Sequence, residues 1–328
     1  LAIMMYFAIN ARDKGTADTL YRHLPQETQH HIDRGSQWIQ TMIAVANAPE
    51  KDRHKFSSFV GPVRLPMRPS IEVLKILDTS IVTKKSSSNP RVIPCQCRMK
   101  GQSHVFVKCF MIKTEDVRQD AMVQDFMKML RICCHHLEHV NYECVTYDVL
   151  PLTKSSGLVT LIPGARTLYS LLMDNMSLQN WTLENNTNFS VDHIKGRFVR
   201  SCAFATTVSM ILSVGDRHLE NMLMTRQGLL FHVDYAMLLG REPNHMKSMI
   251  GNTCRITPQM LDFLGGTTSA YYKTFQKSCG HIYTTARECF VPLYACMVSL
   301  VYDEYCTREF LETVLEQIFC PEAQSSEA

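Results

Sequence analysis

The chain of 328 residues lacks the features that mark several common classes of protein. Its net charge of +3 is too small to indicate a nucleic acid as a partner. Its longest apolar runs, residues 1–9 and 208–214, are too short or too interrupted to cross a bilayer. No secretory signal is visible, and 13 cysteines, an odd number in apolar surroundings, are typical of reduced thiols in a cytosolic protein. Because the first residue is Leu1 rather than Met, we expect the chain to be part of a longer protein.

Glycine-rich phosphate loops are missing as well. A Walker-type loop needs Gly-x-x-x-x-Gly-Lys-Ser/Thr, and a protein-kinase loop needs a run of spaced glycines; neither pattern occurs here. A polar segment at residues 84–90 is the substitute, because hydroxyl and backbone N–H groups there could hold phosphates. Its serines are Ser86, Ser87 and Ser88. The alternative interpretation is the tip of a polar hairpin.

The most informative segment is residues 213–221, Ser-Val-Gly-Asp-Arg-His-Leu-Glu-Asn, which is followed by His-Val-Asp at residues 232–234. A phosphoryl-transfer site needs a base near the acceptor hydroxyl and oxygen ligands for Mg²⁺. Carboxylate and amide oxygens suit the metal, and histidine titrates near neutral pH. These groups are Asp216, His218, Asn221 and Asp234. The pattern predicts a loop, a short strand, a turn at Gln227-Gly228 and a second strand; a capped surface turn is the alternative for Asp-Arg-His alone.

Apolar periodicity predicts an α+β fold with a small sheet-rich lobe and a larger helical lobe, as in protein kinases. Helical spacing occurs at residues 37–46 and 116–134, and most residues after 162 follow helical patterns. Strand-like patterns occur at residues 71–82, 91–97, 104–112, 142–152 and 158–162. We therefore divide the chain into a helical segment and linker (1–60), an N-lobe (61–160) and a C-lobe (161–328).

The motif around Asp216 resembles the catalytic and metal-binding loops of the phosphatidylinositol 3- and 4-kinase family. In that family the order is Asp-Arg-His-x-x-Asn, followed by an aspartate after His-Ile. The segments Gly240-Arg-Glu-Pro243 and Gly265-Gly-Thr-Thr-Ser269 look most like class III phosphatidylinositol 3-kinases. The resemblance extends over residues 60–320, and residues 1–60 look like the end of the family's helical domain.

The resemblance implies roles for the residues of this motif. Asp216 and His218, with Arg217 between them, would act on the acceptor hydroxyl. Asn221 and Asp234 would bind Mg²⁺, with Mn²⁺ as an alternative, so that the charge on the transferred phosphoryl group is neutralised.

The resemblance also implies residues for ATP. Val105-Phe-Val-Lys108 resembles the strand that ends in a phosphate-binding lysine, but its spacing to Asp120 is longer than usual, so Lys113 is a second candidate. We favour Lys108, because a two-residue period places the two lysines on opposite faces of the strand. Asp120 would hold the lysine. The further cofactor contacts would be Tyr147, the backbone of Leu161 and Ile162 against the adenine, and Val233.

Either lysine has a simpler interpretation as a charge at a strand edge, and Asp120 could serve only the dipole of its helix. Ala236 departs from the family, which has Asp-Phe-Gly where this chain has Asp-Tyr-Ala. A glycine there would be free to adopt positive φ, which an alanine rarely does. This departure and the long lysine spacing leave a non-catalytic pseudokinase or scaffold module open.

Residues 234–257 should face the acceptor, and their basic residues are Arg241, Lys247 and Arg255. Inositol rings that carry phosphates would need a denser basic patch, so this sparse charge favours plain phosphatidylinositol. Cys254-Arg-Ile-Thr257 is similar to a segment of the related Ser/Thr protein kinases, which stay an alternative. An amphipathic stripe at residues 310–319 predicts a last helix that packs on the C-lobe or touches a membrane.

We therefore expect an ATP- and Mg²⁺-dependent kinase of phosphatidylinositol that acts at the 3-position. A phosphatidylinositol 4-kinase and a related Ser/Thr protein kinase are the enzymatic alternatives. The resemblance implies regulatory protein subunits and a cytoplasmic location, peripheral to intracellular membranes of the endosomal type. We expect no nucleic acid as a partner.

Overall fold

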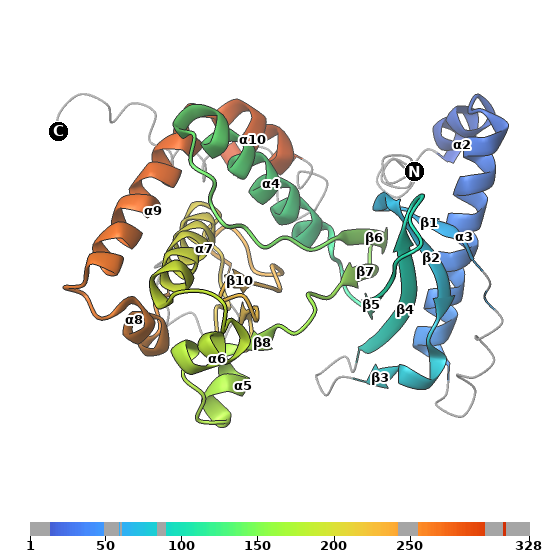
Figure 1. The fold of residues 1–328 in the computed structure, drawn as a ribbon. Coiled ribbons are helices and arrows are strands. Elements are labelled where there is room, and N and C mark those ends of the chain that lie inside the picture. The colour runs from blue at the N-terminus through green and yellow to red at the C-terminus, as the bar shows by residue number, and fades with distance from the viewer. Residues whose placement is uncertain are drawn as a thin grey trace. The chain divides into compact units, whose positions relative to one another are not determined.

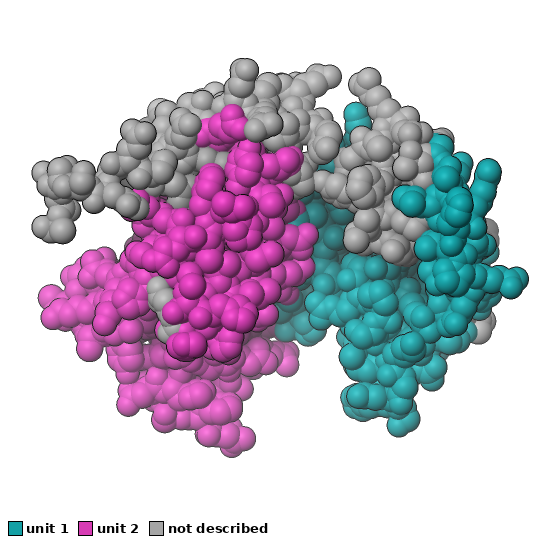
Figure 2. Space-filling view, turned by 90° about the horizontal axis from the view of Figure 1, so that it is seen from above, with its two compact units in different colours: residues 1–121, 147–163 teal, residues 122–146, 164–328 magenta. Residues whose placement is uncertain are grey.

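The computed structural model describes residues 14–48, 59, 61–83, 90–241, 255–298 and 311–312. The chain divides into two compact units, coloured separately in Figure 2. The first comprises Leu1–Ala121 and Tyr147–Pro163, and the second comprises Met122–Thr146 and Gly164–Ala328. Every cysteine in the described part of the chain carries a free thiol. Within the described ranges, none of the helices has the length and apolar character needed to span a bilayer.

An antiparallel sheet forms the body of the first unit (Figure 1). Its strands are β1 (Val63–Leu65), β2 (Arg68–Ile76), β3 (Val82–Thr83), β4 (Arg91–Met99), β5 (Val105–Lys113), β6 (Val149–Thr153) and β7 (Ser156–Thr160). They lie in the order β1-β2-β4-β5-β7-β6, with β3 paired to β4. A short 3₁₀ helix, η2 (Asp78–Ser80), interrupts the strand that the sequence predicted over residues 71–82.

Two helices precede this sheet, α2 (Lys14–Arg22) and α3 (Gln26–Asn47), and Figure 1 shows α3 running along one face of it. Trp38 of α3 is fully buried, and its ring lies edge-on to Phe110 of β5, with centroids 5.2 Å apart. Phe106 and Ile112 of β5 belong to the same apolar cluster. Since side chains alternate along a strand, the even-numbered residues of β5 face α3 and the odd-numbered residues face away from it.

The sequence predicted one strand from Tyr142 to Leu152, and this prediction is wrong for its first half. Only β6, from Val149 onward, is regular. The chain returns here from the second unit to the first: Tyr142 packs on Phe204 in the second unit, at 6.4 Å between ring centroids, whereas Tyr147 already belongs to the first. A single straight strand cannot serve two separate cores.

Helix α7 (Val191–Ile211) forms the centre of the second unit and is buried along most of its length. Its middle is rich in small residues, which let neighbouring elements approach it closely. Around it lie α4 (Arg118–Glu138, which begins in the first unit), α5 (Leu168–Met173), α6 (Leu178–Asn185), α8 (Pro258–Leu264), α9 (Ala270–Glu288) and α10 (Phe290–Met297). A small sheet joins β8 (Arg166–Thr167), β9 (Met222–Met224) and β10 (Leu230–His232). The catalytic motif lies in the connections between α7 and this sheet.

Candidate active site

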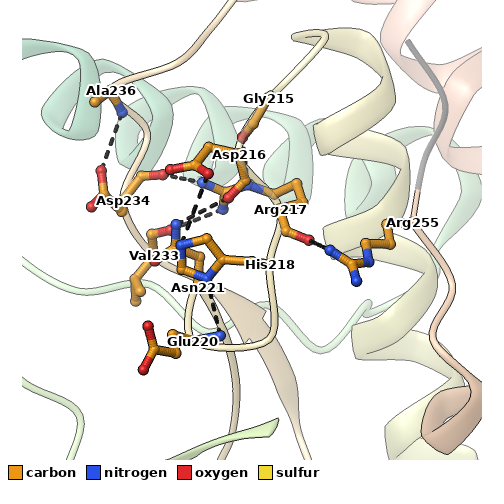
Figure 3. A network of polar contacts seen from close by, with 10 residues as sticks. All are labelled: Gly215, Asp216, Arg217, His218, Glu220, Asn221, Val233, Asp234, Ala236 and Arg255. Carbon is orange, nitrogen blue, oxygen red and sulfur yellow. Dashed lines mark hydrogen bonds and ion pairs between the residues drawn. The ribbon is translucent and has the colours of Figure 1, made fainter. Parts of the chain in front are cut away.

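The loop after α7 brings the predicted catalytic residues together by hydrogen bonds of its own backbone (Figure 3). The His218 N–H donates to the Asp216 carbonyl at 3.0 Å, and the Asn221 N–H donates to the His218 carbonyl at 3.0 Å. Asp216 has a φ of 54°, a conformation that a non-glycine residue adopts only where its surroundings impose it. The loop is therefore a tight and specific structure rather than an extended connection.

His218 is held in one tautomer. Its Nδ1 atom accepts a hydrogen bond of 3.2 Å from the Glu220 backbone N–H, so in the neutral ring the proton is on Nε2. That Nε2 atom lies 3.9 Å from Oδ1 of Asp216, and both side chains are partly exposed. A carboxylate and an imidazole N–H that lie this close can accept and donate protons around one acceptor hydroxyl.

The two predicted metal ligands lie on neighbouring stretches of chain. The hairpin of β9 and β10 pairs Met222 with His232, and the Val233 N–H donates to the Asn221 carbonyl at 3.0 Å. The side chain of Asn221 donates from Nδ2 to the Asp216 carbonyl at 3.0 Å, which leaves Oδ1 as the atom that can bind a metal. Asp234 follows directly, and its Oδ1 accepts from the Ala236 N–H at 3.4 Å.

These ligands fit Mg²⁺ better than a transition metal. Among the residues that the structure describes, no group of three His, Cys, Asp or Glu side chains could hold a metal ion. Mg²⁺ is commonly held by one or two protein oxygens together with substrate phosphates and waters. One amide oxygen and one carboxylate, from Asn221 and Asp234, are a donor set of that kind.

Arg217 connects the two loops through their backbones, as Figure 3 shows. Its guanidinium donates from Nε to the Gly215 carbonyl at 2.9 Å, from Nη1 to the Val233 carbonyl at 2.8 Å, and from Nη2 to the Asp234 carbonyl. The side chain is only 4% exposed and lies over the ring of Tyr235, 5.4 Å from its centroid. Its contacts are those of a residue that fixes the position of Asp234 relative to Asp216.

His232 is a buried group that sequence reasoning left without a role. Its Nδ1 atom lies 2.9 Å from the Ser209 hydroxyl of α7. Burial, followed by the positive charge of Arg217, lowers the pKa of His232 to about 3, so the ring is neutral near physiological pH. The signal in the sequence was a histidine inside an otherwise apolar strand, two residues before Asp234.

Ala236 fits the backbone that it occupies. The positive φ values in this part of the chain belong to Asp234 (62°), Leu239 (56°) and Gly240 (77°), whereas Ala236 is outside that region. Alanine therefore adds no strain where the sequence comparison had expected a glycine. Tyr235 beside it is buried and donates its hydroxyl to the His232 carbonyl at 3.2 Å.

The two candidate lysines lie on opposite faces of β5 in the first unit. Lys108 is on the face toward α3, and its Nζ is 3.4 Å from Oδ2 of Asp148. Asp148 is 6% exposed and also accepts from Arg68 at 2.8 Å. Lys113 is on the other face and forms an ion pair of 2.6 Å with Glu115. Asp148 was not predicted, although a carboxylate within the apolar run after residue 146 is an available signal.

The side chains of Asp120 and Tyr147, both predicted to lie near the cofactor, contact each other. The Tyr147 hydroxyl donates to Oδ1 of Asp120 at 3.1 Å, and both side chains are buried. Beyond β7, the Leu161 N–H donates to the Cys109 carbonyl at 2.9 Å, so this N–H is already engaged. Ile162 is the other residue predicted to meet the adenine, and it is partly buried.

The predicted acceptor residues divide into described and undescribed positions. Arg241 donates from Nε to the Leu238 carbonyl at 3.2 Å, within its own turn. Arg255 donates from Nη1 to the Arg217 carbonyl at 2.7 Å. Lys247, the serines at residues 86–88 and the amphipathic stripe from residue 313 onward lie outside the described residues.

Comparison with known proteins shows which family the chain resembles. The profile of a family described as "Phosphatidylinositol 3- and 4-kinase" matches residues 107–309. The chain is 26% identical over 272 residues to "Phosphatidylinositol 3-kinase, root isoform" of Glycine max, a match that covers 81% of this chain and 31% of that protein. It is 29% identical over 272 residues to "Phosphatidylinositol 3-kinase VPS34" of Arabidopsis thaliana, with the same 81% and 31% covered. A further relative of that name, from Saccharomyces cerevisiae, is 26% identical over 245 residues, or 70% of this chain and 26% of that protein. The chain thus spans about a third of the length of the curated relatives it matches.

Proposed function

Because the chain belongs to the phosphatidylinositol 3- and 4-kinase family, we propose that it transfers the γ-phosphoryl group of ATP to the 3-hydroxyl of phosphatidylinositol. The observation that carries this proposal is the pair of hydrogen-bonded loops that places Asp216 and His218 beside Asn221 and Asp234. The names of the relatives, which are phosphatidylinositol 3-kinases, support the choice of acceptor and of ring position.

In this proposal each residue of the loops has a separate task. Asn221 and Asp234 would hold Mg²⁺, or Mn²⁺ in its place, which supplies positive charge to the phosphate oxygens. The Asp216 carboxylate accepts the proton of the ring hydroxyl as its oxygen bonds to phosphorus and ADP departs. The Nε2–H of His218 donates a hydrogen bond to the oxygens of the phosphoryl group that is transferred. Arg217 keeps the two loops in register, and Val233 helps through its bond to Asn221.

For the nucleotide, the contacts favour Lys113 over Lys108 as the phosphate-binding lysine. Lys108 faces the apolar layer beneath α3 and already neutralises the buried Asp148. Lys113 points from the opposite face. Its ion pair with Glu115, which is 47% exposed, would cost less free energy to break when ATP binds. The adenine would be bound by Ile162, since the N–H of Leu161 is engaged, and the Asp120–Tyr147 pair would line the same site. Ser86, Ser87 and Ser88 would contact the phosphates.

The acceptor determines where the enzyme would work. Phosphatidylinositol resides in a bilayer, so we propose that the chain binds to the surface of intracellular membranes of the endosomal type from the cytoplasmic side. Arg241 and Lys247 would contact the headgroup. The chain is about a third of the length of its relatives, and regulatory protein subunits are a further part of the proposal.

The test is a phosphorylation assay with labelled ATP and Mg²⁺. Vesicles of phosphatidylcholine with phosphatidylinositol are compared with vesicles that carry its 4,5-bisphosphate and with a Ser/Thr peptide. We expect fast labelling of phosphatidylinositol alone, with headgroup chromatography identifying the 3-phosphate. Asp234→Ala should lower the rate by about three orders of magnitude or more, because charge neutralisation is lost. Asp125→Ala, on an exposed face of α4, is the control. Preferential labelling of the peptide would make this a protein kinase, and a 4-phosphate product would make it a 4-kinase.

A further inference from the structure

Arg255 was expected to bind the lipid headgroup, but in the structure its side chain binds a backbone carbonyl of the catalytic loop. We infer that Arg255 is a positioning residue that fixes the backbone of the catalytic loop. Its Nη1 atom donates to the Arg217 carbonyl at 2.7 Å, a charge-assisted hydrogen bond, and Figure 3 shows the two residues joined in this way. The inference rests on the proposed function only for its effect on catalysis; the contact itself is independent of it.

The accepting carbonyl of Arg217 lies between the two predicted proton-transfer residues, Asp216 and His218. It belongs to the same peptide unit as the N–H of His218, and that N–H donates to the Asp216 carbonyl at 3.0 Å. A guanidinium bonded to the carbonyl orients this peptide plane and strengthens the bond on its other side. The geometry of Asp216 relative to His218 therefore depends on Arg255 through the backbone.

Arg255 itself is anchored by the helix that follows it. Thr257 is buried and caps α8, because its Oγ1 accepts from the Met260 N–H at 3.2 Å. Pro258 occupies the first turn of that helix, where its fixed φ suits the helical backbone. Arg255 lies two positions before Thr257, so its side chain extends from a defined backbone, and it is itself partly buried.

Together the two arginines hold the catalytic and metal-binding loops by hydrogen bonds to backbone carbonyls. The side chain of Arg217 binds carbonyls at residues 215, 233 and 234, which sets the metal loop. The side chain of Arg255 binds the backbone of Arg217, which sets the catalytic loop. Arg241 also donates to a backbone carbonyl, that of Leu238, three residues before it. Arg255 therefore connects the chain beyond the acceptor segment to the backbone between Asp216 and His218.

A positioning role and a headgroup-binding role predict different kinetics. If Arg255 positions the loop, Arg255→Ala lowers kcat about 10- to 100-fold, the range for one charge-assisted hydrogen bond, with little change in KM for phosphatidylinositol. ATP hydrolysis without any lipid falls by a similar factor, because water then replaces the acceptor at the same residues. Arg255→Lys keeps one charged donor and restores part of the rate. Arg131→Ala, an exposed arginine of α4, is the matched control and leaves both rates unchanged.

Hydrogen exchange tests the contact without relying on activity. We expect the amides of residues 215–221 to exchange faster in Arg255→Ala than in the wild type, and exchange in α7 to stay unchanged as evidence of an intact fold. Unchanged exchange in the loop, or a raised KM with normal ATP hydrolysis, overturns the inference and returns Arg255 to headgroup binding. A wild-type chain that fails to phosphorylate phosphatidylinositol contradicts the proposed function, but the exchange measurement still decides this inference.

Discussion

Asp148 is a buried carboxylate between two cations, Arg68 and Lys108. Removal of one partner from such a pair leaves charge without full compensation in a poorly solvated place, which destabilises the fold. Lys113 is paired with Glu115, whose side chain is 47% exposed, so this ion pair is better solvated than the one at Asp148. At the scale of single residues, we therefore expect different roles for the two lysines of β5, one in stability and one in phosphate binding.

Substitution of each lysine separates these roles. Lys113→Met should lower kcat by orders of magnitude and weaken binding of an ATP analogue while the urea midpoint changes little, because it removes a phosphate ligand. Lys108→Met should lower the free energy of unfolding by about 1–3 kcal/mol, less than a fully buried pair would lose because Arg68 remains. Kinetics and urea unfolding of both variants check this. A large loss of kcat in Lys108→Met without loss of stability would return the phosphate site to Lys108.

His232 gives the second unit a pH dependence of known sign. Its folded pKa is about 3, below the ordinary value of 6.5, so protons bind the unfolded chain first. The stability is fully present above about pH 6.5 and falls as the pH drops toward 3. Between pH 7.0 and 5.5 this group alone should remove about 1 kcal/mol. His232→Asn should show a shallower decline in urea unfolding followed by Trp181 fluorescence, in a Trp38→Phe background. Equal slopes for the two chains would exclude His232 as the cause.

At the scale of elements, the sequence predicted features that depend on neighbouring residues, but not contacts between residues far apart along the chain. The turn at Gln227-Gly228 was predicted from the glycine, and the structure has Gly228 at a φ of 79° between β9 and β10. The catalytic loop could likewise be predicted from a local pattern, since its polar side chains lie within nine consecutive residues, 213–221. The ion-pair partner of Asp148 could not be assigned, because Arg68 is 80 residues away along the chain.

The backbone contact of Arg255 was not predicted, for a similar reason. Its basic side chain in a sparse acceptor segment indicated a lipid contact, whereas the observed partner is a backbone carbonyl 38 residues earlier. Backbone carbonyls carry no mark in the sequence, so contacts of this kind become visible only when the fold is known. The register of β5 against α3, on which the proposed choice between the lysines rests, is likewise visible only when the fold is known.

Two glycines of the second unit should respond in opposite directions to alanine. Gly228 has positive φ, and an added Cβ would lie 2.6 Å from Cγ2 of Thr182, so Gly228→Ala should cost about 1–3 kcal/mol. Gly196 is within α7, and its nearest neighbour for a Cβ, Nη1 of Arg200, is 3.6 Å away. Gly196→Ala should stabilise the unit by about 0.5–1 kcal/mol through helix propensity. Urea unfolding followed by Trp181 fluorescence measures both. Equal signs for the two substitutions would contradict the assigned backbone.

At the scale of the whole molecule, each unit has its own core and one tryptophan. The cluster that contains Trp38 draws only on residues of the first unit, whereas Trp181 lies in the second, with Arg166 5.4 Å above its ring. The sequence contains no other tryptophan. Units with separate cores commonly unfold as separate cooperative bodies. Single-tryptophan chains can therefore report each unit by itself.

We expect two urea transitions that respond separately to matched core substitutions. Ile93 and Ile211 are both fully buried, the first in the sheet of the first unit and the second at the end of α7. Ile93→Ala should lower the unfolding free energy reported by Trp38 by about 2–5 kcal/mol, the usual range for a core isoleucine cut to alanine. The transition reported by Trp181 should stay in place, and Ile211→Ala should give the reverse. If either substitution shifts both transitions equally, the chain unfolds as one cooperative body, and stability measured at one unit would then report on the other. The Lys108 and His232 experiments would in that case have to be interpreted as properties of the whole chain rather than of one unit.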